Sequence, residues 1–195
     1  MKFTQLPSDT FQEMQLNAGL LLSTFDPSTG TLTKDAIIGA TSGGITFKAK
    51  PSYTDFGEDI DNCPENMMEL KRLKSIEATM GGTFITLTAK SAASLIGAAD
   101  VDSKDATHVV PRGDLATTDF TDVWWVGDYS DKNGEKNGGF VAIHLMNALN
   151  TDGIEIKADD EKKGRFAFSY TAHYSMAAPT KVPFEIFVKS GTDEA

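Results

Sequence analysis

Apolar and polar residues alternate along several stretches of the chain, which is the pattern of half-buried β-strands. The clearest stretch is 165–176, where every second residue from Phe166 to Met176 is apolar or aromatic. Shorter stretches at 17–25, 45–50, 107–110, 120–129, 140–147 and 184–188 predict further strands. Because turns separate these strands and only one helix accompanies them, the pattern indicates a mainly β fold, an antiparallel sandwich or barrel.

The stretch from Leu70 to Gly97 contains the strongest local signals. Gly81-Gly82 lies between two alternating segments, which is typical of a two-residue hairpin turn. Closing the turn there places Ala78 opposite Ile85 on an apolar face. The other face of this predicted hairpin is polar and carries Ser75, Glu77, Thr79, Thr86 and Thr88.

A short helix is predicted directly after this hairpin, at 89–96. Thr88 is of the residue type that caps a helix N-terminus, and Gly97 is the type that ends a helix. Ala92, Leu95 and Ile96 form an apolar stripe, so we expect the helix to cover a sheet.

The segment 51–64 loses the alternation and reads PSYTDFGEDIDNCP. An irregular loop of this length in a small domain usually has a function. Asp59-x-Asp61 begins like an EF-hand calcium loop, but Pro64 stands at the required glycine and Leu70 at the bidentate acid. We therefore interpret the segment as a solvated or intersubunit loop and predict no metal site.

The net charge of the chain limits the classes of molecule that it is expected to bind. The 195 residues include 28 acids and 18 bases, a net charge of −10. This surplus disfavours a protein that grips nucleic acid, although a surface past which DNA slides stays open, as does a role in solubility alone. No apolar run approaches the roughly 20 residues of a membrane span, and the opening residues predict no signal peptide. One cysteine, Cys63, excludes an intrachain disulfide.

The sequence contains none of the common catalytic or phosphate-binding motifs. His108, His144 and His173 fall on separate predicted strands. Cys63 lies in an acidic segment that disfavours its thiolate. We therefore predict no enzyme and no cofactor.

The order of the segments resembles one protein family. The segments are 16–25, Thr46-Phe47 with 51–61, 68–71 through 78–83, the strand 166–176 and the closing strand 182–188. In this order, over about residues 16–189, the chain resembles the major tail tube proteins of long-tailed bacteriophages, most closely those with flexible, non-contractile tails. No segment aligns closely with the related contractile-tail or type VI secretion tube proteins, and the tail type stays open.

The resemblance implies a structural virion protein. In that family a β-sandwich or barrel with one flanking helix, here 89–96, forms six-membered rings that stack around a tape-measure protein, between the tail terminator and distal tail proteins. Double-stranded DNA passes through the lumen without sequence specificity, and assembly takes place in the host cytoplasm. The implied organisation is an arm at 1–15 that contacts other rings, one β domain at 16–189 and a loose tail at 190–195.

Two surfaces follow as candidate sites. The polar hairpin face, or channel wall, is predicted to face an acidic lumen, with an ordinary solvent-facing surface as the alternative. The loop at about 51–64 is predicted to reach a neighbouring subunit or ring, by the resemblance. Its residues are Tyr53, Asp55, Phe56, Glu58, Asp59 and Asp61.

Two other classes of function stay open. The first is a carbohydrate- or receptor-binding sandwich of a phage particle that uses Trp124, Trp125 and Tyr129 as a stacking platform. The second is a hydrolase whose carboxylates come together only in the folded chain. Exposure of these aromatic rings on one edge favours the binding module, whereas their burial at a subunit boundary favours the tube.

Overall fold

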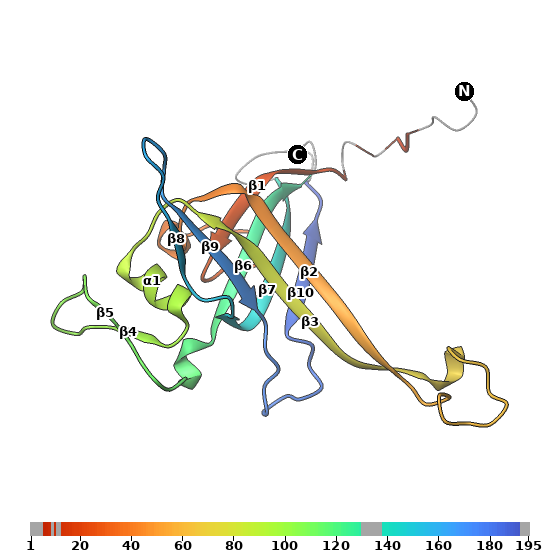
Figure 1. Cartoon of the computed structure of the whole chain (residues 1–195). Coiled ribbons are helices and arrows are strands. Elements are labelled where there is room, and N and C mark those ends of the chain that lie inside the picture. Colours follow the sequence, from red (N-terminus) through yellow and green to blue (C-terminus); the bar gives the residue numbers. More distant parts are fainter. Residues whose placement is uncertain (1–5, 9, 11–12, 130–137, 192–195) are drawn as a thin grey trace.

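The computed structural model describes residues 6–8, 10, 13–129 and 138–191 (Figure 1). In this part of the chain the α-helix is α1 (Ala89–Ile96), and short 3-10 helices lie at Lys34–Ala36, Met68–Leu70 and Thr117–Asp119. The strands are β1 (Gln15–Leu22), β2 (Thr41–Asp55), β3 (Lys71–Phe84), β4 (Ala99–Val101), β5 (Val109–Pro111), β6 (Thr121–Tyr129), β7 (Gly139–Asn150), β8 (Glu155–Lys157), β9 (Arg165–Thr171) and β10 (Phe184–Lys189). The predicted mainly β, antiparallel architecture with one helix is confirmed.

The strands follow the order β1-β6-β7-β9-β3-β2, with β10 added to β7 and β8 added to β9. Strand β7 takes part in two layers. Its first part pairs with β6 and β10, whereas its last residues, Leu149 and Asn150, pair with β9. The sheet therefore folds over on itself at β7, and β4 and β5 form a separate pair beside α1 (Figure 1).

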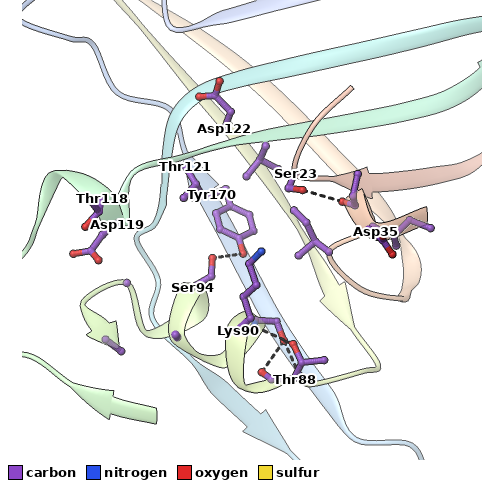
Figure 2. Close-up of a pocket in the computed structure, with 18 residues that line it drawn as sticks. Ser23, Asp35, Thr88, Lys90, Ser94, Thr118, Asp119, Thr121, Asp122 and Tyr170 are labelled. Atoms are coloured by element: carbon purple, nitrogen blue, oxygen red, sulfur yellow. Dashed lines mark hydrogen bonds between the residues drawn. The ribbon is translucent and has the colours of Figure 1, made fainter. Parts of the chain in front are cut away.

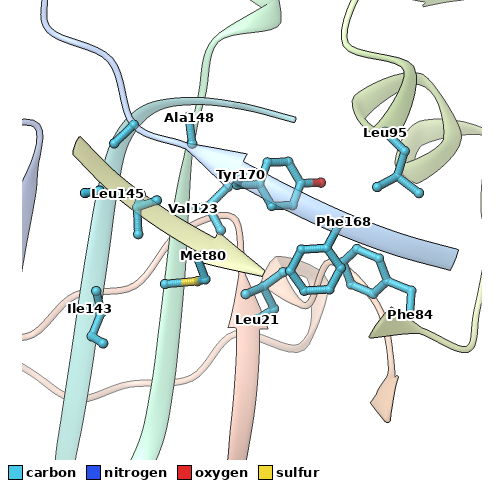
Figure 3. Packing of buried hydrophobic residues seen from close by; sticks show 12 residues of the cluster. Leu21, Met80, Phe84, Leu95, Val123, Ile143, Leu145, Ala148, Phe168 and Tyr170 are labelled. Carbon is cyan, nitrogen blue, oxygen red and sulfur yellow. The ribbon is translucent and has the colours of Figure 1, made fainter. Parts of the chain in front are cut away.

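The main core lies between the two layers (Figure 3). Leu21, Val123 and Leu145 come from the β1-β6-β7 layer, and Met80 and Tyr170 come from the β3-β9 layer. Leu95 of α1 closes one side and is fully buried. Burial of these side chains is the main favourable free energy of the fold.

A second cluster covers the outer face of β6. Phe25, from the loop after β1, lies there between Trp124 and Phe140, with ring centroids 5.8 Å and 5.2 Å away. Strand β6 is thus covered on both faces, as its aromatic residues on both sides indicate.

Helix α1 forms with the predicted bounds, and its ends have the predicted chemistry. The Thr88 hydroxyl accepts a hydrogen bond from the Ser91 backbone N–H at 3.1 Å, and the Ser91 hydroxyl accepts one from Thr88 N–H at 2.8 Å. Gly97 ends the helix with φ of 89°, a conformation that glycine adopts without strain.

The predicted turn at Gly81-Gly82 is wrong. Both glycines lie inside β3, opposite Thr46 and Ile45 of β2, and neither has the positive φ of a hairpin turn. A Cβ on Gly82 would lie 2.7 Å from the Phe168 ring, so this glycine makes room for an aromatic side chain of the core. The true partner of β3 is β2, and the hairpin turns at 56–70.

The alternating stretch 165–176 is a strand only as far as Thr171. Tyr170 is buried as predicted, whereas Met176, which the pattern assigns to the same face, is 99% exposed. Strand β1 begins at Gln15, the last residue of the predicted arm, so the β domain begins one residue earlier than expected. Of the arm, residues 1–5, 9, 11 and 12, and of the C-terminal tail, residues 192–195, lie outside the described residues.

Candidate functional site

Strands β2 and β3 form a long antiparallel ribbon that leaves the body of the molecule (Figure 1). Their pairing extends from Thr41 opposite Phe84 to Asp55 opposite Lys71. The inner half of β3 also pairs with β9, and Thr79 opposite Thr171 is the last such pair. Beyond that point the ribbon has no second neighbouring strand among the described residues.

The far end of the ribbon, residues 53–73, is called the ribbon tip below. Hydrogen bonds inside the tip give it a defined shape. The Asp55 carboxylate accepts backbone hydrogen bonds from Gly57 and Asn66, each at 2.9 Å, and Phe56 N–H donates to Leu70 O at 3.1 Å. The pKa of Asp55 is lowered below its ordinary value, mainly by the backbone hydrogen bond from Gly57. The backbone hydrogen bond from Asn66 and the positive charge of Lys71 have smaller effects in the same direction.

The ribbon tip exposes many large apolar side chains. They are Tyr53, Phe56, Ile60, Met67, Met68 and Leu73, with exposed fractions from 39% for Met67 to 79% for Met68. Exposed apolar side chains gathered on one element usually mark an interaction site. The ribbon tip is therefore the candidate functional surface of the molecule.

Charge is distributed unevenly along the ribbon. The tip carries six acids and two bases, whereas the stem, residues 45–52 and 74–82, carries three lysines and one glutamate. The stem lysines are Lys48, Lys50 and Lys74. The ribbon therefore presents an acidic tip next to a basic stem.

The structure brings the predicted loop residues together. Tyr53 and Asp55 end β2, and Phe56, Glu58, Asp59 and Asp61 follow in the loop. The predicted loop at 51–64 is too long at its start, because 51–55 pair with 71–76 as strands. In the sequence, the tip is recognisable because the alternation of apolar and polar residues stops there and acidic residues become frequent.

The five residues predicted for the channel wall do not share one sheet face. Ser75, Glu77 and Thr79 lie on one face of β3. Thr86 follows the strand, where its hydroxyl accepts a hydrogen bond from Ala40 N–H, and Thr88 caps α1. The error follows from the misplaced turn, which paired 75–80 with 83–88.

The register also brings bases onto this face, contrary to the expectation of hydroxyls and a carboxylate alone. Lys50 lies opposite Glu77, and Lys48 lies opposite Thr79. On the other side of β3, Thr171 lies opposite Thr79. The exposed face of the β2-β3-β9 layer is therefore polar with charges of both signs.

A cavity of about 550 Å³ lies beside α1 (Figure 2). The buried Tyr170 hydroxyl lies 3.0 Å from the Ser94 hydroxyl, and burial raises the pKa of this phenol. Asp119 accepts a hydrogen bond from Ala116 N–H and pairs with Arg112. Each of these polar groups has a partner within the protein, so we interpret them as structural.

The histidines have structural surroundings. His144 Nε2 lies 3.0 Å from Asp122 Oδ2, and Asp122 also accepts the N–H of Asn147 at 3.1 Å. His173 Nδ1 lies 3.1 Å from Asn147 O. Asp122 and Asn147 thus link His144 to His173 at the corner where β7 passes from one layer to the other. The third histidine, His108, is exposed, and its Nδ1 lies 3.7 Å from Asp102 Oδ2.

The described residues contain no group of three or more histidine, cysteine, aspartate or glutamate side chains that could hold a metal ion. Nor do they include a helix with the length and apolar character needed to cross a membrane.

The proposed aromatic platform is mostly covered. Trp124 is 8% exposed and stacks on His144 at 3.9 Å between ring centroids. The Trp125 indole N–H donates to Ala18 O at 3.0 Å. Trp124 therefore has no free face for a sugar, and Trp125 is partly buried against the core.

No protein-family model matches the chain, and no curated protein matches it. A function is therefore proposed below from the chain's own surfaces together with the order of its segments.

Proposed function

We propose that the protein is a structural subunit that assembles with copies of itself into rings, and that stacked rings form a phage tail tube through which DNA passes. The observation that carries this proposal is the ribbon tip, which projects from the body and exposes apolar side chains that nothing in the described chain covers. The resemblance of the segment order to tail tube proteins supplies the six-membered ring and the virion location.

A projecting two-stranded ribbon gains from contact with another molecule. An isolated pair of strands has marginal stability in water, because it buries little apolar surface. Covering Phe56, Ile60 and Met68 on a second copy would remove that surface from water.

The charge pattern favours one orientation of contact. Two acidic tips repel each other, so tip-to-tip pairing is disfavoured. A tip that meets a different surface of the next copy makes a head-to-tail contact, and such contacts repeat into rings or extended stacks.

The sheet offers a second means of association. Strand β2 ends the strand order, and its 15 residues leave one long edge for pairing with another chain. In a ring, copies joined at sheet edges would form a continuous wall.

In this proposal the exposed face of β3 and β9 is the channel wall. Ser75, Glu77 and Thr79 remain candidates for it, together with Thr171. Lys50 opposite Glu77 balances that carboxylate, so the wall we propose is mixed in charge rather than strongly acidic. Lys48, opposite Thr79 on the same face, adds a second base, so the proposed wall carries two lysines and one glutamate among small polar side chains. Such a wall offers passing DNA few cations per copy for phosphate contacts.

The test is electron microscopy with light scattering on the purified protein and on a variant without the tip. Because Asp55 lies opposite Lys71, residues 56–70 can be replaced by Asn-Gly, which closes the pair with a tight turn. We expect rings or tubes from the native protein and folded monomers from the variant. A native protein that stays monomeric at every concentration contradicts the proposal, as does a variant that assembles equally well.

The carbohydrate-binding alternative gains no support from this structure, because Trp124 is buried and Trp125 is engaged with the backbone.

A further inference from the structure

A second hollow, here called the β1 pocket, has a volume of about 570 Å³. The strand ends that surround it lie on the body of the molecule, away from the ribbon tip (Figure 1). It lies where β6 and β10 end and β7 begins. The described residues with apolar side chains that line it are Leu20, Phe25, Leu32, Val126 and Phe140.

The walls of the β1 pocket are apolar yet partly open. Leu20 is 40% exposed and Leu32 is 45% exposed, although both face a pocket of a size that holds several side chains. Gly30 lies against the Phe140 ring, where a Cβ would come within 3.2 Å, so the loop approaches the sheet closely and shapes the floor.

The described residues that line the β1 pocket include one acid, Asp128, and one base, Lys189, so their charges balance. The Asp128 carboxylate accepts a hydrogen bond from the Asn17 side-chain amide at 2.6 Å. The Lys189 ammonium lies 5.7 Å from the centre of the Phe140 ring, beside the pocket. A carboxylate entering the pocket would therefore find a lysine at its rim.

The other two hollows suit the tip less well. The cavity beside α1 carries Asp35, Asp119 and Asp122 with a single lysine, Lys90, so it repels an acidic segment. The third hollow lies on the polar sheet face and is lined mainly by glycines and hydroxyls, with Phe168 buried beneath.

We propose that the β1 pocket of one copy receives the ribbon tip of the next copy, with Phe56 or Ile60 in the apolar hollow and a tip carboxylate at Lys189. This inference rests on the proposed function, because it names the contact that stacks one ring on another. The donor and acceptor surfaces are different regions of the same molecule, so the contact is head-to-tail and repeats in one direction. The ribbon beyond Ile76 adds about 17 Å of strand to the loop, at roughly 3.3 Å per residue, which extends the tip away from its own body.

The native cysteine gives a direct test. Cys63 lies in the ribbon tip and is the one cysteine of the chain, so a second cysteine can report on its neighbours without background. Leu32→Cys places a thiol in the β1 pocket. Leu115→Cys is the matched control, because Leu115 is 51% exposed and does not line the pocket.

Both variants are assembled under reducing conditions, oxidised, and separated by non-reducing electrophoresis. We expect a ladder of disulfide-linked multimers from Leu32→Cys and at least tenfold less from Leu115→Cys. Thr29→Cys, on the same pocket wall, replaces Leu32→Cys if the latter does not assemble.

The outcomes separate the two proposals. Tubes without a ladder, or with equal ladders from pocket and control variants, overturn the docking of the tip while the tube function stands. Absence of any assembly from the native protein overturns both. Loss of stacking in Leu32→Glu, with normal stacking in Leu115→Glu, is the independent result that we expect from a filled pocket.

Discussion

The hydroxyl of Tyr174 makes two hydrogen bonds with the backbone of one residue, Ile76. It accepts from Ile76 N–H at 2.9 Å and donates to Ile76 O at 3.3 Å. This contact lies three residues beyond the last pair between β3 and β9. Tyr174 therefore takes the place of a strand neighbour at the base of the ribbon, where the sheet ends and the projecting part begins.

Removal of this hydroxyl should loosen the ribbon. Tyr174→Phe keeps the ring but leaves the Ile76 N–H and O without their partner, at a cost of about 1–2 kcal/mol in the free energy of unfolding. Amide hydrogen exchange at Ile76 should accelerate while exchange in β7 changes little. Unchanged exchange at Ile76 would show that the ribbon does not depend on this contact.

A methyl group at Gly82 should disturb the core. Gly82→Ala places a Cβ against the Phe168 ring, and overpacking of this kind costs about 1–3 kcal/mol. Gly113→Ala is the control, since nothing lies within 4 Å of its added Cβ. Urea denaturation measures both, and equal stabilities of the two variants would contradict the role assigned to Gly82.

The wrong prediction of a turn at Gly81-Gly82 shows that a local sequence pattern alone does not determine which strands pair. Two adjacent glycines between alternating segments are typical of a turn, and only the position of Phe168, about 86 residues away, reveals why glycine is needed there. The helix was predictable because Thr88 and Gly97 are local signals, whereas the return hydrogen bond of Ser91 in the cap was not foreseen. The short strands β4 and β8, each of three residues, leave too little alternation to recognise.

Truncation of the helix cap should weaken α1. Thr88→Ala removes the acceptor for Ser91 N–H and should lower the free energy of unfolding by about 1 kcal/mol. Thr24→Ala, at an exposed loop position, is the comparison and should change stability by less than about 0.5 kcal/mol. Thermal denaturation followed by circular dichroism distinguishes the two.

The ribbon tip should loosen in acid. The pKa of Asp55 is lowered from its ordinary 3.8, mainly by the Gly57 and Asn66 backbone hydrogen bonds. A depressed folded-state pKa contributes stability above the ordinary value, and this contribution is lost as the pH falls through the folded-state pKa. Amide signals of Gly57 and Asn66 should therefore shift below pH 3.8 in the native protein.

Asp55→Asn is the control for this titration, because its side chain cannot ionise. Its Gly57 and Asn66 signals should show little change over the same pH range. Asp26 and Asp105 also have lowered pKa values, through hydrogen bonds from Ser28 and Thr107. The titration must therefore be followed at the amide signals of Gly57 and Asn66 rather than in the stability of the whole protein. If these signals shift in Asp55→Asn as they do in the native protein, the assignment to Asp55 is contradicted.

The residue types of the candidate site were predictable from the sequence, but the residues that lie opposite one another in the sheet were not. The acids of the tip and the lysines at Lys48 and Lys50 are visible in the sequence. That Lys50 lies opposite Glu77 depends on a pairing across the 15-residue connection 56–70, which no short-range signal specifies. The exposure of Met68 and the burial of Trp124 likewise depend on how the layers pack.

Cryo-electron microscopy of particles grown from the purified protein tests the central claim most directly. We predict hollow rings in which the ribbon tip of each copy contacts another copy and the face of β3 that carries Ser75, Glu77 and Thr79 points toward the axis. Particles with the ribbon free in solvent and that face turned outward would contradict the account, and so would a protein that remains a 21.0 kDa monomer at every concentration.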